Sequence, residues 1–299
     1  MREAVLLESH FPLGLPKRGK VRDIYDLGDQ LLFVATDRIS AFDWILPEGI
    51  PGKGYVLTQF CKFWFERLLR QGIPNHFITS DVREFPSECQ PHRDLLNGRS
   101  MLVKKGIPLP VEAIVRGYVA GGGWKEYSET GSVGGERLPV GMCESELLPK
   151  PIFTPSTKAP VGKHDVNMAF SHLEAEIGEH LAGEIKKRSC AIYTEAATYA
   201  LSRGILIADT KFEFGLDHKT GQLILIDELL TPDSSRFWLQ SAYQQGKKQS
   251  PLDKQYVRDY LLSIKWNGSS PPPHLPDRVI EETRKRYFEA MERLIGAGN

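Results

Sequence analysis

Apolar residues gather in short runs and helical stripes that predict alternating strands and helices. Residues 17–36 combine a basic, glycine-containing loop with two apolar runs joined at Gly28-Asp29, which predicts a β-hairpin. From Val56 to Leu69 aromatic and aliphatic residues recur at helical spacing, so we expect a helix that faces the core. Further short strands are predicted at 76–79 and 100–104.

Prolines and glycines that mark the ends of elements and a boundary between lobes are concentrated in the middle of the chain. The prolines in residues 105–110 cannot donate to a central strand ladder, and we interpret this segment as a hinge between two lobes. Strand-like residues resume at 111–120 and end at the glycines that follow. Residues 131–163 are rich in Gly, Pro, Ser and Thr and have little periodicity, which indicates a long loop used for binding or as a lid. Helices are predicted from Asp165 to about Arg203 and from Pro276 to Leu294.

The composition is that of an ordinary globular chain. Of 299 residues, 41% are hydrophobic and 25% are charged, which excludes a disordered or collagen-like protein. Lys and Arg number 38, as do Asp and Glu, so no overall basic excess indicates nucleic acid or an anionic membrane as a partner. No apolar run approaches the ~20 residues of a membrane span, and the start lacks a secretory signal. The four cysteines form no C-x-x-C pair, and we expect a cytoplasmic protein without a disulfide framework or a zinc site.

Residues 204–228 carry the most informative chemistry, because two apolar strands surround a tight polar turn. A period of two places Asp209, Lys211 and Glu213 on one face. If residues 219–221 form a three-residue turn with a left-handed glycine, Glu213 falls directly opposite Asp227. Two carboxylates ~5 Å apart at Cβ repel each other unless a cation compensates, and Mg²⁺ takes such ligands in ATP sites. An ion-pair network between Lys211 and its flanking acids explains the pattern equally well.

Two other segments have the chemistry of anion sites. Ser234, Ser235 and Arg236 follow a proline and suit a phosphate or carboxylate, although a turn with a surface arginine is the alternative. The basic residues 17–20 with Arg22 could cover a triphosphate, but the sequence is no Walker A motif, and a solvated basic turn is the simpler interpretation. No H-E-x-x-H or G-x-S-x-G motif occurs, which argues against zinc and serine hydrolases.

Taken together, six segments resemble, in order and almost from end to end, the SAICAR synthetase family (phosphoribosylaminoimidazole-succinocarboxamide synthases) of purine biosynthesis. They are residues 19–25, 35–43, 109–116, 207–215, 227–236 and 250–258. The resemblance implies a two-lobed α+β fold with a kinase-like, antiparallel-sheet N-terminal lobe (1–109). A larger α+β C-terminal lobe (110–299) would hold the metal and the nucleotide substrate, with ATP between the lobes.

The resemblance also implies the reaction and its co-substrates. An ATP-dependent ligase would join the carboxylate of 5-amino-1-(5-phosphoribosyl)imidazole-4-carboxylate (CAIR) to the amine of L-aspartate. The products would be SAICAR, ADP and phosphate. ATP and Mg²⁺ would be required, and the partners would be these small molecules, with no nucleic acid and no membrane. A small-molecule kinase and an ATP-responsive binding module are the alternatives, and the sequence leaves the oligomeric state open.

Residue by residue, the resemblance assigns roles to the positions that match the motifs. The ATP-binding positions are Gly19, Lys20, Arg22, Val103, Lys104 and Glu112, and the metal-binding carboxylates are Glu213 and Asp227. The substrate-binding positions are Arg116, Asp165, Lys211, Ser234, Ser235, Arg236, Lys254 and Arg258. Lys20 and Lys211 are expected to be catalytic.

Two points of the resemblance are incomplete. The block that contains Asp37, Arg38 and Ser40 is assigned only loosely to the active-site cleft. Where the family usually has a Gly-Ser pair that helps to hold the nucleotide, this chain has Gly121-Gly122, so a hydroxyl is missing. A backbone N–H or a water molecule can replace that contact.

Overall fold

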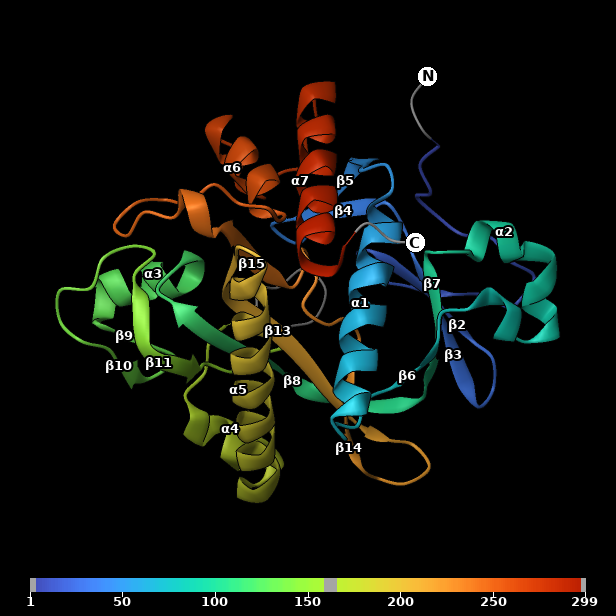
Figure 1. Cartoon of the computed structure of the whole chain (residues 1–299), viewed down its shortest axis with the longest axis horizontal. Helices are drawn as coiled ribbons and strands as arrows, with labels where there is room; N and C mark the ends of the chain where they lie inside the picture. Colours follow the sequence, from blue (N-terminus) through green and yellow to red (C-terminus); the bar gives the residue numbers. More distant parts are fainter. Residues whose placement is uncertain (1–3, 159–165, 297–299) are drawn as a thin grey trace.

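We describe the fold from a computed structural model, which covers residues 4–158 and 166–296. It is a mixed α+β arrangement in which helices cover antiparallel sheets (Figure 1). The first sheet has the strand order β1-β2-β3-β7-β6. Its strands are β1 (Lys17–Arg18), β2 (Arg22–Asp26), β3 (Gln30–Ala35), β6 (Phe77–Thr79) and β7 (Ser100–Lys104).

The larger sheet has the order β11-β8-β13-β14, with β12 paired to β8 and β15 paired to β13. Its strands are β8 (Gly106–Tyr118), β11 (Leu147–Phe153), β12 (Ser156–Thr157), β13 (Ile205–Asp217), β14 (Leu223–Ile226) and β15 (Ser235–Leu239). Two small antiparallel pairs complete the strands: β4 (Arg38–Ala41) with β5 (Trp44–Gly49), and β9 (Ser132–Val133) with β10 (Glu136–Arg137).

Three long helices lie over the sheets (Figure 1): α1 (Lys53–Arg70), α5 (Glu179–Ser202) and α7 (Asp277–Ile295). The shorter α-helices are α2 (Arg93–Leu96), α3 (Gly121–Thr130), α4 (Phe170–Ile177) and α6 (Gln255–Ser263). The 3₁₀ turns are η1 (Val82–Glu84), η2 (Ser87–His92) and η3 (Gln240–Ala242). Within the part of the chain that the structure describes, no helix is both long and apolar enough to span a membrane.

One hydrophobic core joins the two sheets. Phe60 and Trp64 of α1, Phe212 of β13 and Tyr287 of α7 are all essentially buried in it, as is Val103 of the first sheet. This core crosses the boundary predicted between the lobes at 109 and 110. Burial of large side chains from both sheets stabilises them as a single packed unit.

Most of the predicted elements are confirmed. The hairpin at Gly28-Asp29 joins β2 to β3, and the helices predicted at 56–69 and 276–294 are α1 and α7. The short strands at 76–79 and 100–104 correspond to β6 and β7.

Three predictions are wrong in part. The segment 105–110, interpreted as a hinge, is largely the start of β8, where Pro108 lies opposite Gly215 of β13. The loop predicted at 131–163 contains β9 to β12. The single helix predicted from 165 to 203 is two helices, α4 and α5, because the chain turns at Gly178 with a φ of 88°. A left-handed residue with no Cβ allows this break.

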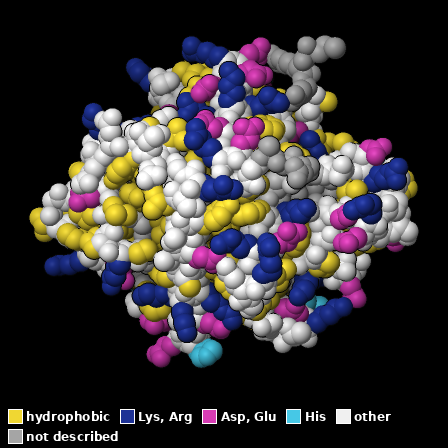
Figure 2. Space-filling model, in the orientation of Figure 1, with side chains coloured by type: hydrophobic (Ala, Val, Ile, Leu, Met, Phe, Trp, Pro, Cys, Tyr) yellow, Lys and Arg dark blue, Asp and Glu magenta, His cyan; other side chains and the backbone are white. Residues whose placement is uncertain are grey.

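Figure 2 shows acidic and basic side chains interspersed on one face of the molecule, as the zero net charge leads one to expect. Charge is nevertheless buried inside. The Lys53 ammonium lies 2.8 Å from an Asp233 carboxylate oxygen, and their side chains are 0% and 2% exposed. The Tyr287 hydroxyl donates to the other oxygen of Asp233 at 2.7 Å. These contacts connect α1 and α7 to the loop before β15.

We predict that Lys53→Met strongly destabilises the protein, because the Asp233 carboxylate stays buried without its cation. The expected loss is about 3 kcal/mol in the free energy of unfolding. The double variant Lys53→Met/Asp233→Asn should recover most of it. Urea unfolding followed by circular dichroism measures both. As a control, Lys219→Met breaks an ion pair with Asp29 whose side chains are 65% and 82% exposed, and should change stability little. Equal effects of the two lysine substitutions would contradict this account.

Candidate active site

A cavity of about 750 Å³ lies between the first sheet and the β8–β13 pair. Its walls come from the loop around β1, the β4–β5 turn, β8, β13 and the segments that follow β14 and precede α6. The structure brings most of the residues predicted for the site together on these walls. They are Gly19, Lys20, Arg22, Glu112, Arg116, Lys211, Glu213, Asp227, Ser234, Ser235, Arg236, Lys254 and Arg258.

Two of the predicted residues that the structure describes lie outside the cavity lining. Val103 is fully buried in the core, and Lys104 is exposed at the end of β7; neither side chain lines the cavity. Asp165 lies outside the described residues. The backbone contact with adenine that was predicted for 103 and 104 stays a prediction.

The alternation predicted for β13 is confirmed on its charged face. Asp209, Lys211 and Glu213 line the cavity, whereas Phe212 and Phe214 are buried in the core. A period of two puts successive side chains on opposite faces of a strand. Thr210 departs from this pattern, because it also lines the cavity, next to a register irregularity between β13 and β15. Apart from this residue, the strand presents functional groups on one side while its other side stabilises the fold.

The partner predicted for Glu213 is wrong by one residue of register. Glu213 pairs with Ile226, not with Asp227, because the turn after β13 has four residues instead of three. The Asp217 carboxylate accepts hydrogen bonds from the amides of Lys219 and Thr220 at 2.9 and 3.0 Å and closes this longer turn. Gly221 is left-handed, as predicted, with a φ of 70°.

Asp227 still reaches the cavity, because it lies beyond the end of β14. Its φ is 65°, a left-handed conformation that takes it out of the alternation of the strand. One carboxylate oxygen lies 2.5 Å from the Arg22 guanidinium, whose other terminal nitrogen is 2.9 Å from Glu228. Burial would raise the pKa of Asp227, but Arg22 and Lys211 outweigh burial and hold that pKa below its ordinary value.

The carboxylate directly opposite Glu213 is Glu112, on β8. Like charges in this position destabilise a sheet unless a cation lies between them. The Lys211 ammonium provides it, at 2.5 Å from Glu112 and 3.5 Å from Glu213. Lys158, which the sequence reasoning missed, also pairs with Glu213. Burial would lower the pKa of Lys211, but the two carboxylates outweigh burial and raise it.

These contacts make the acidic end of the cavity an ion-pair network, one of the two interpretations left open by the sequence. Within residues 4–158 and 166–296, no group of three or more His, Cys, Asp or Glu side chains is arranged as a complete metal site. The donor set nevertheless suits Mg²⁺, which takes one or two carboxylates and completes its shell with phosphate oxygens and water. Glu213 and Asp227 supply such oxygens, and both line the cavity.

The other end of the cavity is rich in cations. Arg116 and Arg236 both bind the Asp209 carboxylate, at 2.9 and 2.5 Å. Lys254 and Arg258 line the same cavity with them. Because two arginines share one carboxylate, this end keeps an excess of positive charge that suits a phosphate or carboxylate ligand.

Burial affects the two ionisable residues that begin the α6 segment. It lowers the pKa of Lys254 to about 8, with a further decrease from Arg258 and an opposing effect of Asp233. It raises the pKa of Asp253 to about 6, although that carboxylate accepts hydrogen bonds from the amides of Phe237 and Gln255. Lys254 is thus a cation whose charge changes close to neutral pH.

Two serines stand at this end on a structured loop. Ser234 exchanges hydrogen bonds with Thr231, and the Ser235 hydroxyl lies 2.8 Å from that of Thr210 on β13. Asp233, between Thr231 and Ser234, is anchored by the buried Lys53. The tertiary contacts therefore hold the loop in place, which favours the anion-site interpretation over a solvated surface turn.

The two glycines at the start of α3 differ in their surroundings. Gly121 has a φ of 53°, and a Cβ there would lie 2.1 Å from the Arg236 guanidinium. A Cβ at Gly122 meets nothing within 4 Å, and this residue lines the cavity. The first position accepts only glycine, whereas the second has room for the hydroxyl that the chain lacks.

Several cavity residues were missed at the level of sequence. Asp43 pairs with Lys20, and Glu228 with Arg22, while Lys158, Asp209 and Asp253 complete the charge network. The period of β13 had placed Asp209 on the correct face. The others come from distant segments whose proximity no local pattern encodes.

Comparison with known proteins identifies the family. The family model described as SAICAR synthetase matches residues 15–273. A phosphoribosylaminoimidazole-succinocarboxamide synthase from Geobacter metallireducens is 54% identical over 295 residues, which are 98% of this chain and 99% of that protein. One from Syntrophobacter fumaroxidans is also 54% identical and covers 98% of this chain and 97% of its own.

Solved structures with the same fold extend the comparison. The SAICAR synthase from Saccharomyces cerevisiae, complexed with SAICAR, has a TM-score of 0.86 and 41% identity, over 98% of this chain and 99% of that one. A SAICAR synthetase in complex with ADP has a TM-score of 0.70 and 26% identity, over 95% and 99%. The family model matches most of this chain, and each of these relatives aligns over nearly the full length of both proteins. The chain therefore belongs to the SAICAR synthetase family.

Proposed function

We propose that the cavity catalyses the ATP-dependent joining of the CAIR carboxylate to the amine of L-aspartate, giving SAICAR, ADP and phosphate. The observation that carries this proposal is the division of one cavity into an acidic end, around Glu112, Glu213 and Asp227, and a cationic end. A ligase of this kind must hold a metal-bound triphosphate and a phosphorylated sugar together, and the two ends have the matching chemistry.

ATP is proposed to lie at the acidic end. Gly19, Lys20 and Arg22 come from the loop that borders this end of the cavity, and the ADP complex of a structural relative supports nucleotide binding here. Glu213 and Asp227 would hold Mg²⁺ together with phosphate oxygens. When bound, the metal neutralises charge on the transferring phosphoryl group.

CAIR is proposed to occupy the cationic end. Arg116, Arg236, Lys254 and Arg258 surround space beside Ser234 and Ser235, and these groups can donate to the ribose phosphate. The SAICAR complex of the yeast relative supports a product site in this fold. With its ribose phosphate at the cationic end, CAIR would direct its imidazole carboxylate toward the acidic end, where the γ-phosphate would lie.

The chemistry follows from the weakness of a free carboxylate as an acyl donor. The CAIR carboxylate attacks the γ-phosphorus, ADP leaves, and an acyl phosphate results. The aspartate amine then attacks the acyl carbon and phosphate leaves, so no covalent enzyme nucleophile is needed. Lys20 and Lys211 stabilise negative charge on the phosphoryl oxygens, and the fixed positions of both substrates lower the entropic cost of reaction.

We also propose that the protein works in the cytoplasm. The four cysteines are all free, which is typical of proteins in a reducing compartment.

The reaction itself is tested by phosphate release from MgATP and CAIR, with and without L-aspartate, while SAICAR formation is followed by absorbance. We expect phosphate and SAICAR in equal amounts only when L-aspartate is present. Succinate, which has both carboxylates but no amine, is the matched control and should give no amide. Full phosphate transfer without any amide product would replace the ligase with a kinase.

Removing either proposed metal carboxylate should abolish most turnover. Glu213→Gln and Asp227→Asn are expected to lower kcat by on the order of 100-fold or more, since charge neutralisation by the metal contributes several kcal/mol. A magnesium titration of kcat measures this and should also show weaker apparent affinity for the metal. Binding of ADP without metal serves as the control and should be retained. Unchanged turnover at saturating Mg²⁺ would sink the assignment.

Affinity for CAIR should fall as pH rises through the pKa of Lys254, about 8. The lysine is charged and binds phosphate below this pH and is neutral above it, whereas the substrate phosphate stays dianionic throughout. We expect KM for CAIR to rise on the order of fivefold between pH 7 and 9. Lys254→Arg keeps its charge and should give a flat profile. The same slope in both proteins would show that another group titrates.

A further inference from the structure

In the segment that borders the ATP end of the cavity, every backbone carbonyl from Gly19 to Arg22 accepts a hydrogen bond from Arg38 or Thr36. The Arg38 guanidinium donates to the carbonyl oxygens of Gly19, Lys20 and Arg22, at 2.8, 3.3 and 3.1 Å. The remaining carbonyl, that of Val21, accepts from both the amide and the hydroxyl of Thr36 at 2.9 Å.

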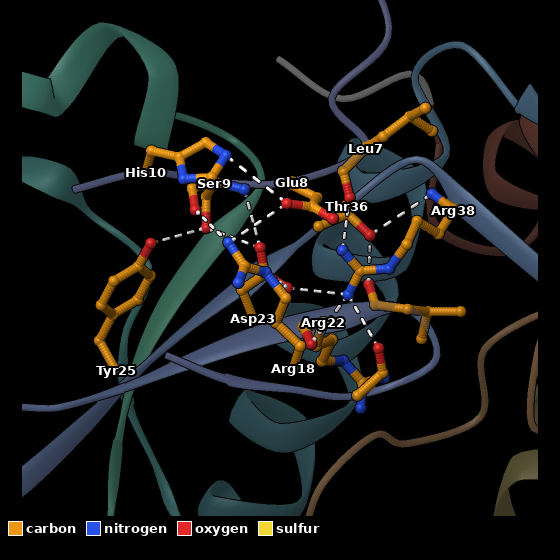
Figure 3. A network of polar contacts seen from close by, with 12 residues as sticks. Leu7, Glu8, Ser9, His10, Arg18, Arg22, Asp23, Tyr25, Thr36 and Arg38 are labelled. Carbon is orange, nitrogen blue, oxygen red and sulfur yellow. Dashed lines mark hydrogen bonds and ion pairs between the residues drawn. The ribbon is translucent and has the colours of Figure 1, made fainter. Parts of the chain in front are cut away.

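The Arg38 guanidinium is itself held in place by an ion pair and by the N-terminal segment. Its side chain is 7% exposed and lies 2.8 Å from a carboxylate oxygen of the fully buried Asp23. The other oxygen of Asp23 accepts from the amide and the hydroxyl of Ser9, each at 2.8 Å. Arg38 also donates to the carbonyl of Leu7, so the N-terminal segment contributes to the hydrogen bonds that hold the guanidinium (Figure 3).

This arrangement has a consequence for the amides of the loop. In a trans peptide, the C=O of one residue and the N–H of the next point in opposite directions. The described residues contain no cis peptide bond. Because the carbonyls of Gly19 and Lys20 point at Arg38, the N–H groups of Lys20 and Val21 point away from it, and both residues line the cavity.

We infer that Arg38 is a positioning residue, which orients the backbone amides of Lys20 and Val21 toward the phosphates of ATP. Successive amides that converge on one point form a cradle for anions. The guanidinium suits this task, because its donors are spread over three nitrogens in a fixed plane and reach carbonyls that the N–H groups of a single ammonium nitrogen cannot span together. The inference rests on the proposed function, since it presumes that the loop meets a nucleoside triphosphate.

The test compares phosphate-bearing and phosphate-free ligands in the full-length protein. Arg38→Lys keeps a positive charge beside Asp23 but loses the fork. We expect its Kd for MgATP, measured by calorimetry, to rise on the order of tenfold, since bonds to charged groups are lost. The Kd for adenosine, measured by competition, should stay within about twofold, because adenosine has no phosphate.

Arg99→Lys is the matched control. Arg99 is another largely buried arginine beside the first sheet, and its guanidinium contacts Asp37 at 3.2 Å and the carbonyl of Ala35 at 3.4 Å. Replacing the Arg99 guanidinium by an ammonium tests the general effect of an arginine substitution in this region. We expect MgATP affinity within about twofold of the unsubstituted protein, and thermal melting shows whether each variant is folded.

Thr36→Val provides a second, milder variant in case Arg38→Lys does not fold. It has nearly the same shape and removes the hydroxyl that donates to the Val21 carbonyl and accepts from the Arg38 amide, so it should weaken MgATP binding by a few fold and leave adenosine binding unchanged. If a folded Arg38→Lys, or Thr36→Val in its place, binds MgATP as tightly as the original protein, the inference is wrong. An equal loss for adenosine would also overturn it, because it would indicate a structural role alone. If the unsubstituted protein binds no MgATP, the proposed function itself fails.

Discussion

The placement of Lys211 between two carboxylates is the constraint on which the site depends. Glu112 and Glu213 lie directly opposite each other on β8 and β13, the longest strands of the molecule, and like charges in that position destabilise a sheet. Lys211, on the same face, lies close to both, and Lys158 provides a second cation for Glu213. The central strand pair can therefore be both a structural backbone and the floor of a charged cavity.

Buried charge in this protein is concentrated where chemistry is proposed, and apolar packing elsewhere supports it. Each buried ion loses hydration, and a good partner recovers only part of that loss. The ion pairs Lys53–Asp233 and Arg22–Asp227 therefore serve mainly to fix the positions of these side chains, and contribute little to the net stability of the fold. The core beneath α1, α5 and α7, which continues from one sheet into the other, stabilises the fold that holds them. The zero net charge of the chain conceals this local separation into an acidic end and a cationic end.

The two ends are built by different means. The cationic end uses side chains on β8, β13 and the segments around β15, each held by a carboxylate or hydroxyl neighbour. The acidic end adds a backbone element, the loop of residues 19–22, whose shape depends on Arg38, Thr36 and the N-terminal segment. The groups proposed to bind ATP and those proposed to bind CAIR are thus held by different sets of contacts. The family match over residues 15–273 spans both.

Sequence alone determined the elements that depend on local patterns and the residues whose type dictates their chemistry. The hairpin at Gly28-Asp29, helices α1 and α7, and the charged face of β13 follow from short-range periodicity, and most of the residues that the resemblance assigned to the site line one cavity. Only the tertiary structure decided that Glu213 faces Glu112. One additional residue in a turn shifts every pair in a hairpin, and the longer turn found here is closed by hydrogen bonds to the Asp217 carboxylate. It also decided that residues 106–110 extend a strand, and that Arg38 serves the loop of residues 19–22. Such contacts join segments far apart in the chain, and no local pattern records them.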